Sequence, residues 1–534
     1  MLKRIIAIAI AAVLLLLCTS CANGGKKTVE SDTGGVGSEP GETNAQRKQI
    51  SRLVTKNGRT YVEYKGQPFL IYAVALRPDN IEAEGIYDYA ELENYFRYSA
   101  ECGFKTVALG AFWKNIEVSK DNYNYSDLRD FIKMAEKYDL NILLGWGGGN
   151  NCGGPCVPGY MWADSETYPR LKGFEEETFD ISHPNFIERS VKAVSALMDF
   201  LYENDVNNRV VMMQIESEID NAVIPIDWQD NAQVAKATFA GGQIEGSFKL
   251  VNEEGMAVKN SKLPMVTRHN FTISTYWNEE FKKKNILKRA FALNGLDIIG
   301  INTYSPNVKN QNTLMDFLNS QIDPTRNVPH IPETNGHTGL IVNLAMQAFA
   351  RGEGSVYYEL RTAEKQDGDW GIYRKSSTQW IQRDGTLSVP VPLSGDGSTM
   401  PELKHSELLA FNTAINKASA LLASMPKDNI AAFNIEKSKG AYTSVEKCGQ
   451  WNVNYSSPTG GEAMAISEMD GSLVLLSLFD GGKFSVVGKP LKGDISIGSF
   501  DKDGKWVQET TAAASGGEVT LGAGMCARVT KDNM

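Results

Sequence analysis

The sequence feature that most constrains the fold is a regular alternation between residues 50 and 380. Short apolar runs rich in β-branched residues alternate there with longer amphipathic stretches, a pattern typical of repeated βα units that form a parallel sheet. Eight runs qualify as strands, at residues 70–76, 106–112, 140–146, 210–215, 264–268, 296–301, 328–332 and 355–360. Eight strands of this kind predict a closed (β/α)8 barrel.

Two of the intervening stretches have the periodicity of amphipathic helices. Residues 127–138 (DLRDFIKMAEKY) and 186–201 (FIERSVKAVSALMDFL) carry apolar side chains at three- and four-residue spacing. An open doubly wound sheet is the competing architecture, but no GxGxxG sequence follows the first predicted strand. We therefore predict an α/β fold in which a (β/α)8 TIM barrel occupies residues 47–400, with residues 59–65 in a short hairpin that covers its floor.

The chain is too long for the barrel alone. Its 534 residues exceed the ~250 to 300 residues at which a single hydrophobic core stops growing. After residue 400, a predicted helix near residues 402–423 leads into short strands separated by glycine-rich turns, as in GSLVLLSLFDGGKFSVVG and GGEVTLGAGMCARV. Residues 401–534 are therefore expected to form a helix followed by a C-terminal β-sandwich.

The N-terminus has the order of a secretory signal. Two basic residues precede an apolar run over residues 5–17, and small residues then lead to Cys21. This ending resembles a bacterial lipobox, whose cysteine is lipidated after cleavage, although Cys18 stands where leucine is usual. We expect a lipoprotein signal peptide at 1–21 and a flexible, polar tether at 22–46. The protein would then be lipid-anchored in the bacterial cell envelope, outside the cytoplasm, with simple secretion as the alternative.

Composition narrows the classes of ligand. The net charge is −10, and phosphate binding needs an excess of clustered Lys and Arg, so a nucleic-acid partner is not expected. Only five histidines are present, without HExxH or paired-ligand spacing, so we predict no bound metal and no cofactor. Cys152 and Cys156 flank a GGP turn and are interpreted as a loop disulfide or as free thiols.

Two glutamates stand where a barrel enzyme places its catalytic groups, at the carboxyl ends of strands. Glu218 follows the fourth predicted strand and Glu333 follows the seventh. Glu216 is the rival of Glu218, because it lies two residues earlier and would point to the same side if the strand continued. Glycoside hydrolysis with retention requires such a pair: one acid protonates the departing oxygen, while the other carboxylate attacks the anomeric carbon.

The order of motifs resembles that of clan A glycoside hydrolases, whose retaining members carry the acid/base after strand four and the nucleophile after strand seven. QIESEID (214–220) is similar to the QxENE motif of family 35 β-galactosidases, and PGYMWADSETYPRL (158–171) resembles another segment of that family. Family 42 shares much of this layout. Ser217 replaces the asparagine that usually binds the sugar 2-hydroxyl, which leaves the substrate open. The resemblance implies a β-galactosidase-like enzyme acting on an oligosaccharide or polysaccharide, with Glu218 as acid/base and Glu333 as nucleophile.

Further residues near the predicted strand ends are candidates for sugar binding. Trp113, Trp146 and Trp162 follow strands or occupy loops on the catalytic side, where an aromatic face can stack on sugar C–H groups. The resemblance also gives Tyr304 a hydrogen bond to the nucleophile. The remaining candidates for the sugar pocket are Asn150, preferred to its neighbour Asn151, together with Ser217 and Asn302.

Two other functions fit parts of this pattern. A carbohydrate-binding surface lipoprotein that has lost catalysis is consistent with Ser217 and with the C-terminal β-domain, but the two carboxylates argue against it. A metal-dependent hydrolase on the same barrel would need clustered histidine ligands, which the sequence lacks.

Overall fold

The structure is a computed structural model. It describes residues 49–79, 88–149, 156–172, 178–220, 243–305, 307–335, 340–362, 372–376, 379–381, 405–435, 443–479 and 481–534. The predicted signal peptide with Cys21, the predicted tether, Asn150 and Cys152 lie outside the described residues.

Eight parallel strands form the central barrel, in the order β11-β10-β9-β8-β5-β4-β13-β12. A parallel bridge between Thr303 and Thr334 closes the remaining gap between β11 and β12, and Thr303 N donates to Glu333 O over 3.0 Å. All eight predicted strands are present, so the predicted TIM barrel is confirmed. The strands are β4 (Tyr72–Ala75), β5 (Thr106–Phe112), β8 (Asn141–Gly147), β9 (Val210–Ile215), β10 (Val266–Phe271), β11 (Ile298–Ile301), β12 (His330–Asn335) and β13 (Gly354–Tyr358).

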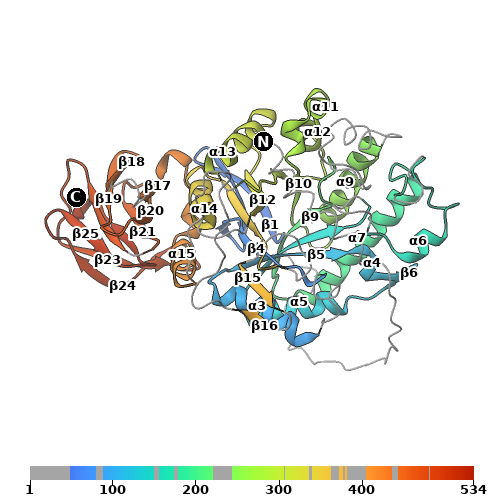
Figure 1. Ribbon diagram of the computed structural model, residues 1–534, viewed down its shortest axis with the longest axis horizontal. Coiled ribbons are helices and arrows are strands. Elements are labelled where there is room, and N and C mark those ends of the chain that lie inside the picture. The colour runs from blue at the N-terminus through green and yellow to red at the C-terminus, as the bar shows by residue number, and fades with distance from the viewer. Residues whose placement is uncertain are drawn as a thin grey trace.

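Helices surround the barrel (Figure 1). The two predicted helices are confirmed, and each turns the face that carries its apolar residues inward. The main helices are α3 (Tyr89–Glu101), α5 (Ser126–Lys137), α7 (Pro184–Asn204), α9 (Gln243–Lys259), α12 (Ile286–Phe291), α13 (Val308–Gln321) and α14 (Leu340–Ala350). Shorter elements are α4 (Trp113–Ile116), β6 (Glu117–Ser119), β7 (Asn122–Tyr123), α6 (Gly159–Ala163), α10 (Ser274–Trp277), α11 (Glu279–Lys283), β14 (Arg361–Thr362), β15 (Tyr373–Ser376) and β16 (Gln379–Ile381).

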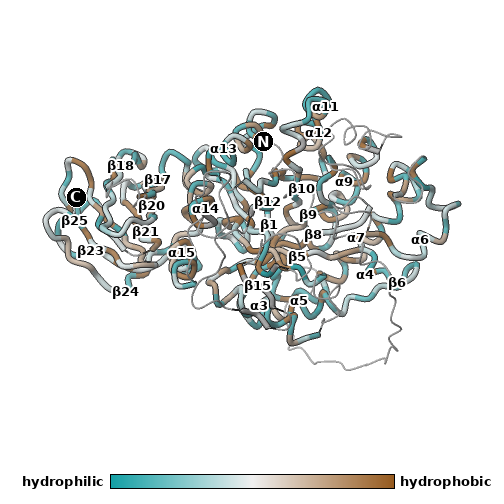
Figure 2. Tube along the Cα trace, in the orientation of Figure 1, coloured by the Kyte–Doolittle hydropathy of each residue, from teal (hydrophilic) through white to brown (hydrophobic). Residues whose placement is uncertain are grey.

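Hydropathy follows this layering. Figure 2 shows hydrophobic segments along the central strands, and hydrophilic ones on outer elements such as α11. The burial of β-branched strands inside a ring of amphipathic helices provides the core of the barrel. In the part of the chain that the structure describes, no helix combines the length and the apolar character that a membrane crossing requires.

A small antiparallel sheet, which includes the predicted hairpin, covers the amino end of the barrel. It consists of β1 (Ser51–Lys56), β2 (Arg59–Tyr64) and β3 (Gln67–Phe69). Ile50 N donates to Pro264 O over 3.0 Å, and Val266 N donates to Ser51 Oγ over 2.9 Å. Both contacts lie where β10 begins, so this sheet is the floor, and the opposite end, where the strands finish, is the mouth of the barrel.

The C-terminal part is a helix pair followed by two antiparallel sheets, which confirms the predicted β-sandwich. Phe433, Tyr455, Leu475, Phe484 and Val519 come from both sheets and share one core. The helical elements are α15 (His405–Lys417), α16 (Ser419–Ser424), η3 (Lys427–Asn429) and η5 (Lys531–Asn533). The six-stranded sheet has the order β17 (Ile430–Ile435), β20 (Gly461–Ser467), β21 (Leu473–Ser477), β26 (Cys526–Val529), β23 (Asp494–Phe500) and β24 (Trp506–Ala513). The four-stranded sheet has the order β18 (Thr443–Cys448), β19 (Trp451–Ser456), β22 (Gly482–Val486) and β25 (Glu518–Leu521).

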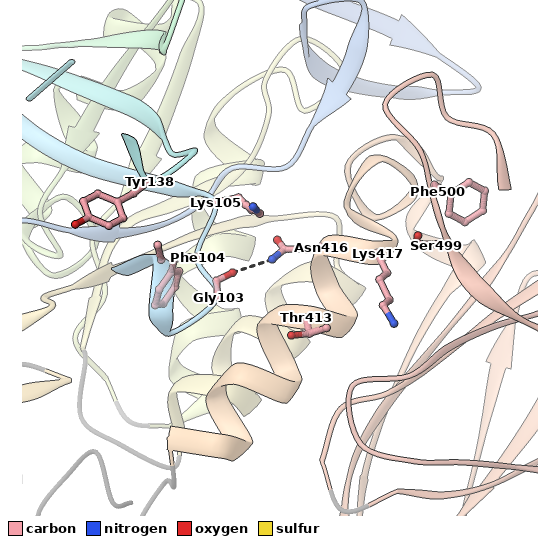
Figure 3. Close-up of a pocket in the computed structure, with 10 residues that line it drawn as sticks. Gly103, Phe104, Lys105, Tyr138, Thr413, Asn416, Lys417, Ser499 and Phe500 are labelled. Atoms are coloured by element: carbon pink, nitrogen blue, oxygen red, sulfur yellow. Dashed lines mark hydrogen bonds between the residues drawn. The ribbon is translucent and has the colours of Figure 1, made fainter. Parts of the chain in front are cut away.

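The sandwich attaches at the amino end of the barrel. Asn412 Nδ2 and Asn416 Nδ2, both on α15, donate to Cys102 O over 2.7 Å and to Gly103 O over 2.8 Å, just before β5 begins. Beside this contact lies an open cavity of about 420 Å³ between barrel and sandwich, with Lys105 and Lys417 among its lining residues (Figure 3). This cavity is at the opposite end of the barrel from the mouth.

Candidate active site

Glu218 and Glu333 are brought together at the carboxyl ends of the strands. Glu218 lies in the turn after β9, and Asn302, which follows β11, donates from Nδ2 to Glu218 Oε1 over 2.7 Å. Glu333 lies in β12 and has two donors of its own. Asn270 Nδ2 on β10 reaches Glu333 Oε1 over 3.2 Å, and the Tyr304 hydroxyl donates to Glu333 Oε2. Each carboxyl group is therefore held by its own neutral donors, from neighbouring strands.

The strand that carries Glu333 is locally irregular. The pairing of β12 with β13 shifts register between Ile331 and Thr334, so one extra residue is accommodated on β12. Such a bulge redirects side chains at the rim of a barrel. The neighbouring Gly300 permits this close approach, because a Cβ at that position would lie 2.5 Å from Pro332 Cγ. The local sequence around Pro332 therefore helps to direct the Glu333 side chain.

The turn that carries Glu218 is held by β10. The backbone φ of Glu218 is 55°, in the left-handed region that non-glycine residues rarely occupy. Glu218 N donates to Asn270 O over 3.1 Å. Burial lowers the pKa of His269 to about 4, so its ring is neutral near pH 7. His269 Nδ1 then donates to Ile215 O over 2.6 Å, while its Nε2 accepts from Ile219 N over 3.5 Å, and the ring spans the turn.

The electrostatics of the site couple the two glutamates. Removal of the Glu333 carboxyl from water raises its pKa to about 7, and the negative charge of Glu218 acts in the same direction. The hydrogen bond from Tyr304 and the positive charges of Arg77 and Arg268 oppose this rise. Because the carboxyl groups interact, their protons belong to the pair. The pair thus retains a proton into the neutral range, as an acid and a carboxylate that act together require.

The guanidinium of Arg77 places a positive charge near Glu333. It follows β4, and its Nη2 pairs with Asp79 Oδ2 over 2.5 Å. Its guanidinium lies 5.6 Å from the centre of the Tyr358 ring and donates to the Tyr358 hydroxyl. The Tyr358 ring in turn meets the Tyr304 ring edge-on, with 6.1 Å between centres. The positive charge is therefore fixed close to the carboxylate that it stabilises.

Glu216 points away from this pair. Its carboxylate accepts from Gly148 N over 3.2 Å and from Gly149 N over 2.9 Å, in the loop that follows β8. Glu216 is fully buried, whereas Glu333 retains some exposure at the mouth. Of these two glutamates, Glu218 is therefore the one that lies next to Glu333.

The predicted tryptophans lie in different environments. Trp113 and Trp146 are almost completely buried, and their indole N–H groups donate to Glu117 over 2.7 Å and to Glu254 over 3.1 Å. The sugar-stacking role predicted for these two does not fit, because their rings pack in the core. Trp162 on α6 is 36% exposed, with the Arg170 guanidinium 4.4 Å from its ring centre.

The other residues predicted to bind sugar are also not all placed at the site. Asn302 and Tyr304 contact the two glutamates directly, and Ser217 is buried beside Glu218 with 8% exposure. The position of Asn150 is outside the described residues.

Sequence reasoning missed three polar residues of the site. Arg268 and Asn270 alternate along β10, and Arg77 follows β4. The first two carry a signal, because residues two apart on a strand face the same side, although both lie within the polar run from Arg268 to Asn270. Arg77 carries no comparable signal, since its contact with Tyr358 joins residues distant in sequence.

No protein-family model matches the chain, and no curated protein sequence matches it. Solved structures similar to this chain include a β-galactosidase from the psychrophilic Marinomonas ef1, with 10% identity, coverage of 67% of this chain and 62% of that chain, and a TM-score of 0.46. A family 39 glycoside hydrolase from the gut symbiont Bacteroides cellulosilyticus WH2 has 13% identity, coverage of 89% and 85%, and a TM-score of 0.41. An endo-1,4-β-mannanase from Rhizomucor miehei has 11% identity, coverage of 58% of this chain and 91% of that chain, and a TM-score of 0.40.

These similar structures are all glycoside hydrolases by name. The chain spans about 62% of the length of the Marinomonas enzyme. At such identities and TM-scores the likeness carries no functional assignment, so the function must be argued from the side chains themselves.

Proposed function

We propose that this protein is a retaining glycoside hydrolase that cleaves β-glycosidic bonds by double displacement. The observation that carries the proposal is the meeting of Glu218 and Glu333, each with its own hydrogen-bond donors, at the mouth of the barrel. Two carboxyl groups facing one sugar supply both the acid and the nucleophile that this reaction needs.

Glu333 is suited to the role of nucleophile. The hydrogen bond from Tyr304 and the charges of Arg77 and Arg268 favour its ionised form against burial and against Glu218. An ionised Glu333 attacks the anomeric carbon while Glu218 protonates the departing oxygen, which breaks the glycosidic bond and forms a glycosyl-enzyme ester.

Glu218 then changes role because its surroundings change. Esterification removes the negative charge of Glu333, so the repulsion that favoured a proton on the pair disappears. Glu218, now ionised, accepts a proton from a water molecule, which attacks the anomeric carbon and releases the sugar with its original configuration.

The substrate that we propose first is a β-galactoside or a closely related β-glycoside at the end of an oligosaccharide or polysaccharide. The support is the resemblance of residues 214–220 and 158–171 to family 35 motifs, with family 42 as the near alternative. A panel of aryl β-glycosides tests this, with Glu333→Gln as the inactive control. Binding of sugars without turnover of any panel member would favour an inactive carbohydrate-binding protein.

We also propose that the protein is exported and held at the cell envelope by lipid on Cys21. The support is the order of charged, apolar and small residues in 1–21 and the polar composition of 22–46. Each buried acyl CH2 contributes about 0.8 kcal/mol to anchoring, so Cys21→Ser should move the protein from membrane to soluble fractions. Unchanged membrane retention would refute the lipid anchor.

A further inference from the structure

Two buried carboxyl groups lie next to each other behind the candidate acid/base. Glu216 follows β9 and Glu254 lies in α9, and both are 0% exposed. They lie on either side of Gly148 and Trp146: a Cβ on Gly148 would lie 2.7 Å from Glu216 Oε1 and 3.0 Å from Trp146 Nε1, whose N–H donates to Glu254 Oε1. Two ionised carboxylates in contact, away from water, are strongly unfavourable, whereas one carboxylate and one carboxylic acid form a hydrogen bond.

The contacts distinguish the two groups. Both oxygens of Glu216 face backbone donors, at Gly148 N and Gly149 N, so Glu216 needs to be an acceptor on each side. Glu254 Oε1 accepts from Trp146 Nε1 and from the Ser190 hydroxyl. In the described part of the chain, no N–H or O–H group donates to Glu254 Oε2. The oxygen Oε2 of Glu254 is therefore the natural place for a proton.

The surrounding charges agree with this placement. Burial raises the pKa of Glu254 well above its ordinary value, and Glu216 adds to the rise, while Ser190 and Trp146 oppose it. On the packed helix α7, the cation next to Ser190 in the sequence is Arg189, and its guanidinium is paired with Glu117 and Asp121.

We propose that Glu254 is a buried carboxylic acid that donates its proton to Glu216, and that this pair positions the acid/base Glu218. Glu216 and Glu218 both have left-handed backbones, with φ of 52° and 55°, a region that non-glycine residues rarely occupy. The turn between them needs attachment on both sides. Glu216 ties it to the loop after β8, and Asp220 ties it to Thr272 N over 3.0 Å, after β10.

The shared proton can be tested by stability alone. When a carboxyl group keeps its proton in the folded state, the folded protein loses stability as pH rises above the pKa of that group in the unfolded chain. The reason is that the unfolded chain releases the proton first. From about pH 5 to about pH 9 the melting temperature of Glu254→Gln should therefore fall less than that of the wild type. Glu253→Gln, an exposed neighbour on the same helix, is the matched control and should follow the wild type. Equal slopes for Glu254→Gln and wild type would overturn the proposal.

The positioning role rests on the proposed function and is tested by an asymmetry in turnover. The amide of Glu254→Gln can still donate to Glu216, so kcat should stay within about threefold of wild type. Glu216→Gln turns an NH2 group toward the glycine donors, and Glu254→Leu removes the donor. Each should lower kcat by about tenfold or more with little change in KM, since small displacements of catalytic groups are costly. The opposite pattern, with Glu216→Gln tolerated and Glu254→Gln impaired, would overturn the proposal. If the wild type hydrolysed no glycoside, the melting experiment would still decide the shared proton.

Discussion

Glu218 and Glu216 give different expectations for chemical rescue, although a single residue separates them. Glu218→Ala should lower kcat by about 10²-fold or more, because both proton transfers are lost. With a good leaving group, added azide should restore the second step, since that anion attacks the glycosyl-enzyme without a base. The appearance of a β-glycosyl azide product is the measurement.

Glu216→Ala is the matched comparison for this rescue. It disturbs the turn without removing the proton donor, so azide should not restore its turnover or yield a glycosyl azide. Rescue confined to Glu216→Ala would transfer the acid/base role to Glu216.

The pH profile tests the charge beside the nucleophile. Arg77 holds the pKa of Glu333 below the value that burial and Glu218 would otherwise give. A nucleophile acts only when ionised, so activity is lost as pH falls through the pKa of the pair. Arg77→Met should therefore move the acidic limb of kcat/KM to higher pH.

A surface arginine provides the control for Arg77. Arg52 is 61% exposed in its pair with Glu63 on the floor of the barrel, and Arg52→Met should leave the acidic limb in place. An unchanged limb in Arg77→Met, with activity retained, would contradict the electrostatic role of Arg77.

The candidate site was predictable where chemistry coincides with a strand end. Glu218, Glu333, Asn302 and Tyr304 all follow or finish apolar runs, and the structure places Asn302 against Glu218 and Tyr304 against Glu333. The tryptophans were less predictable, because a large aromatic residue after a strand can turn to the mouth or to the core. Trp113 turned inward because Glu117 offers its indole N–H a buried acceptor.

The strands were predicted more accurately than their ends. Apolar β-branched runs identified all eight barrel strands, but the fifth was predicted to stop at residue 268, whereas β10 continues to Phe271. The polar residues His269 and Asn270 interrupt the apolar pattern on which the prediction rests. In the structure β10 continues through both residues, and Asn270 contacts Glu333.

The junction between the barrel and α15 predicts a local change in stability. Gly103 has a φ of 83°, and a Cβ there would lie 2.9 Å from Asn412 Cβ. Gly103→Ala should lower the free energy of unfolding by roughly 1 to 3 kcal/mol through backbone strain and overpacking. Glycosidase activity should remain, because the junction is at the amino end of the barrel.

Gly58→Ala is the control that separates the effect of backbone strain from that of the contact with Asn412. Gly58 has a φ of 74°, but a Cβ there would meet nothing within 4 Å. Its loss of stability, measured by denaturant unfolding, should therefore be smaller than that of Gly103→Ala. Equal losses would mean that the contact with Asn412 contributes nothing.

At the scale of the whole molecule, the sandwich lies away from the mouth of the barrel. Figure 1 shows the C-terminal sheets at one end of the long axis, beyond α14 and α15. The contacts of α15 with Cys102 and Gly103 place that end at the start of the barrel strands. Helix α15 therefore joins the sandwich to the barrel at the end opposite to the one where Glu218 and Glu333 lie.

The stereochemistry of the first product tests the pairing of Glu218 with Glu333 most directly. Proton NMR of the early hydrolysis of a β-glycoside distinguishes the two anomers before mutarotation mixes them. Double displacement inverts the anomeric carbon twice, so the first-formed sugar should be the β-anomer. A first-formed α-anomer would contradict the covalent role of Glu333, because a single displacement by water inverts the configuration once.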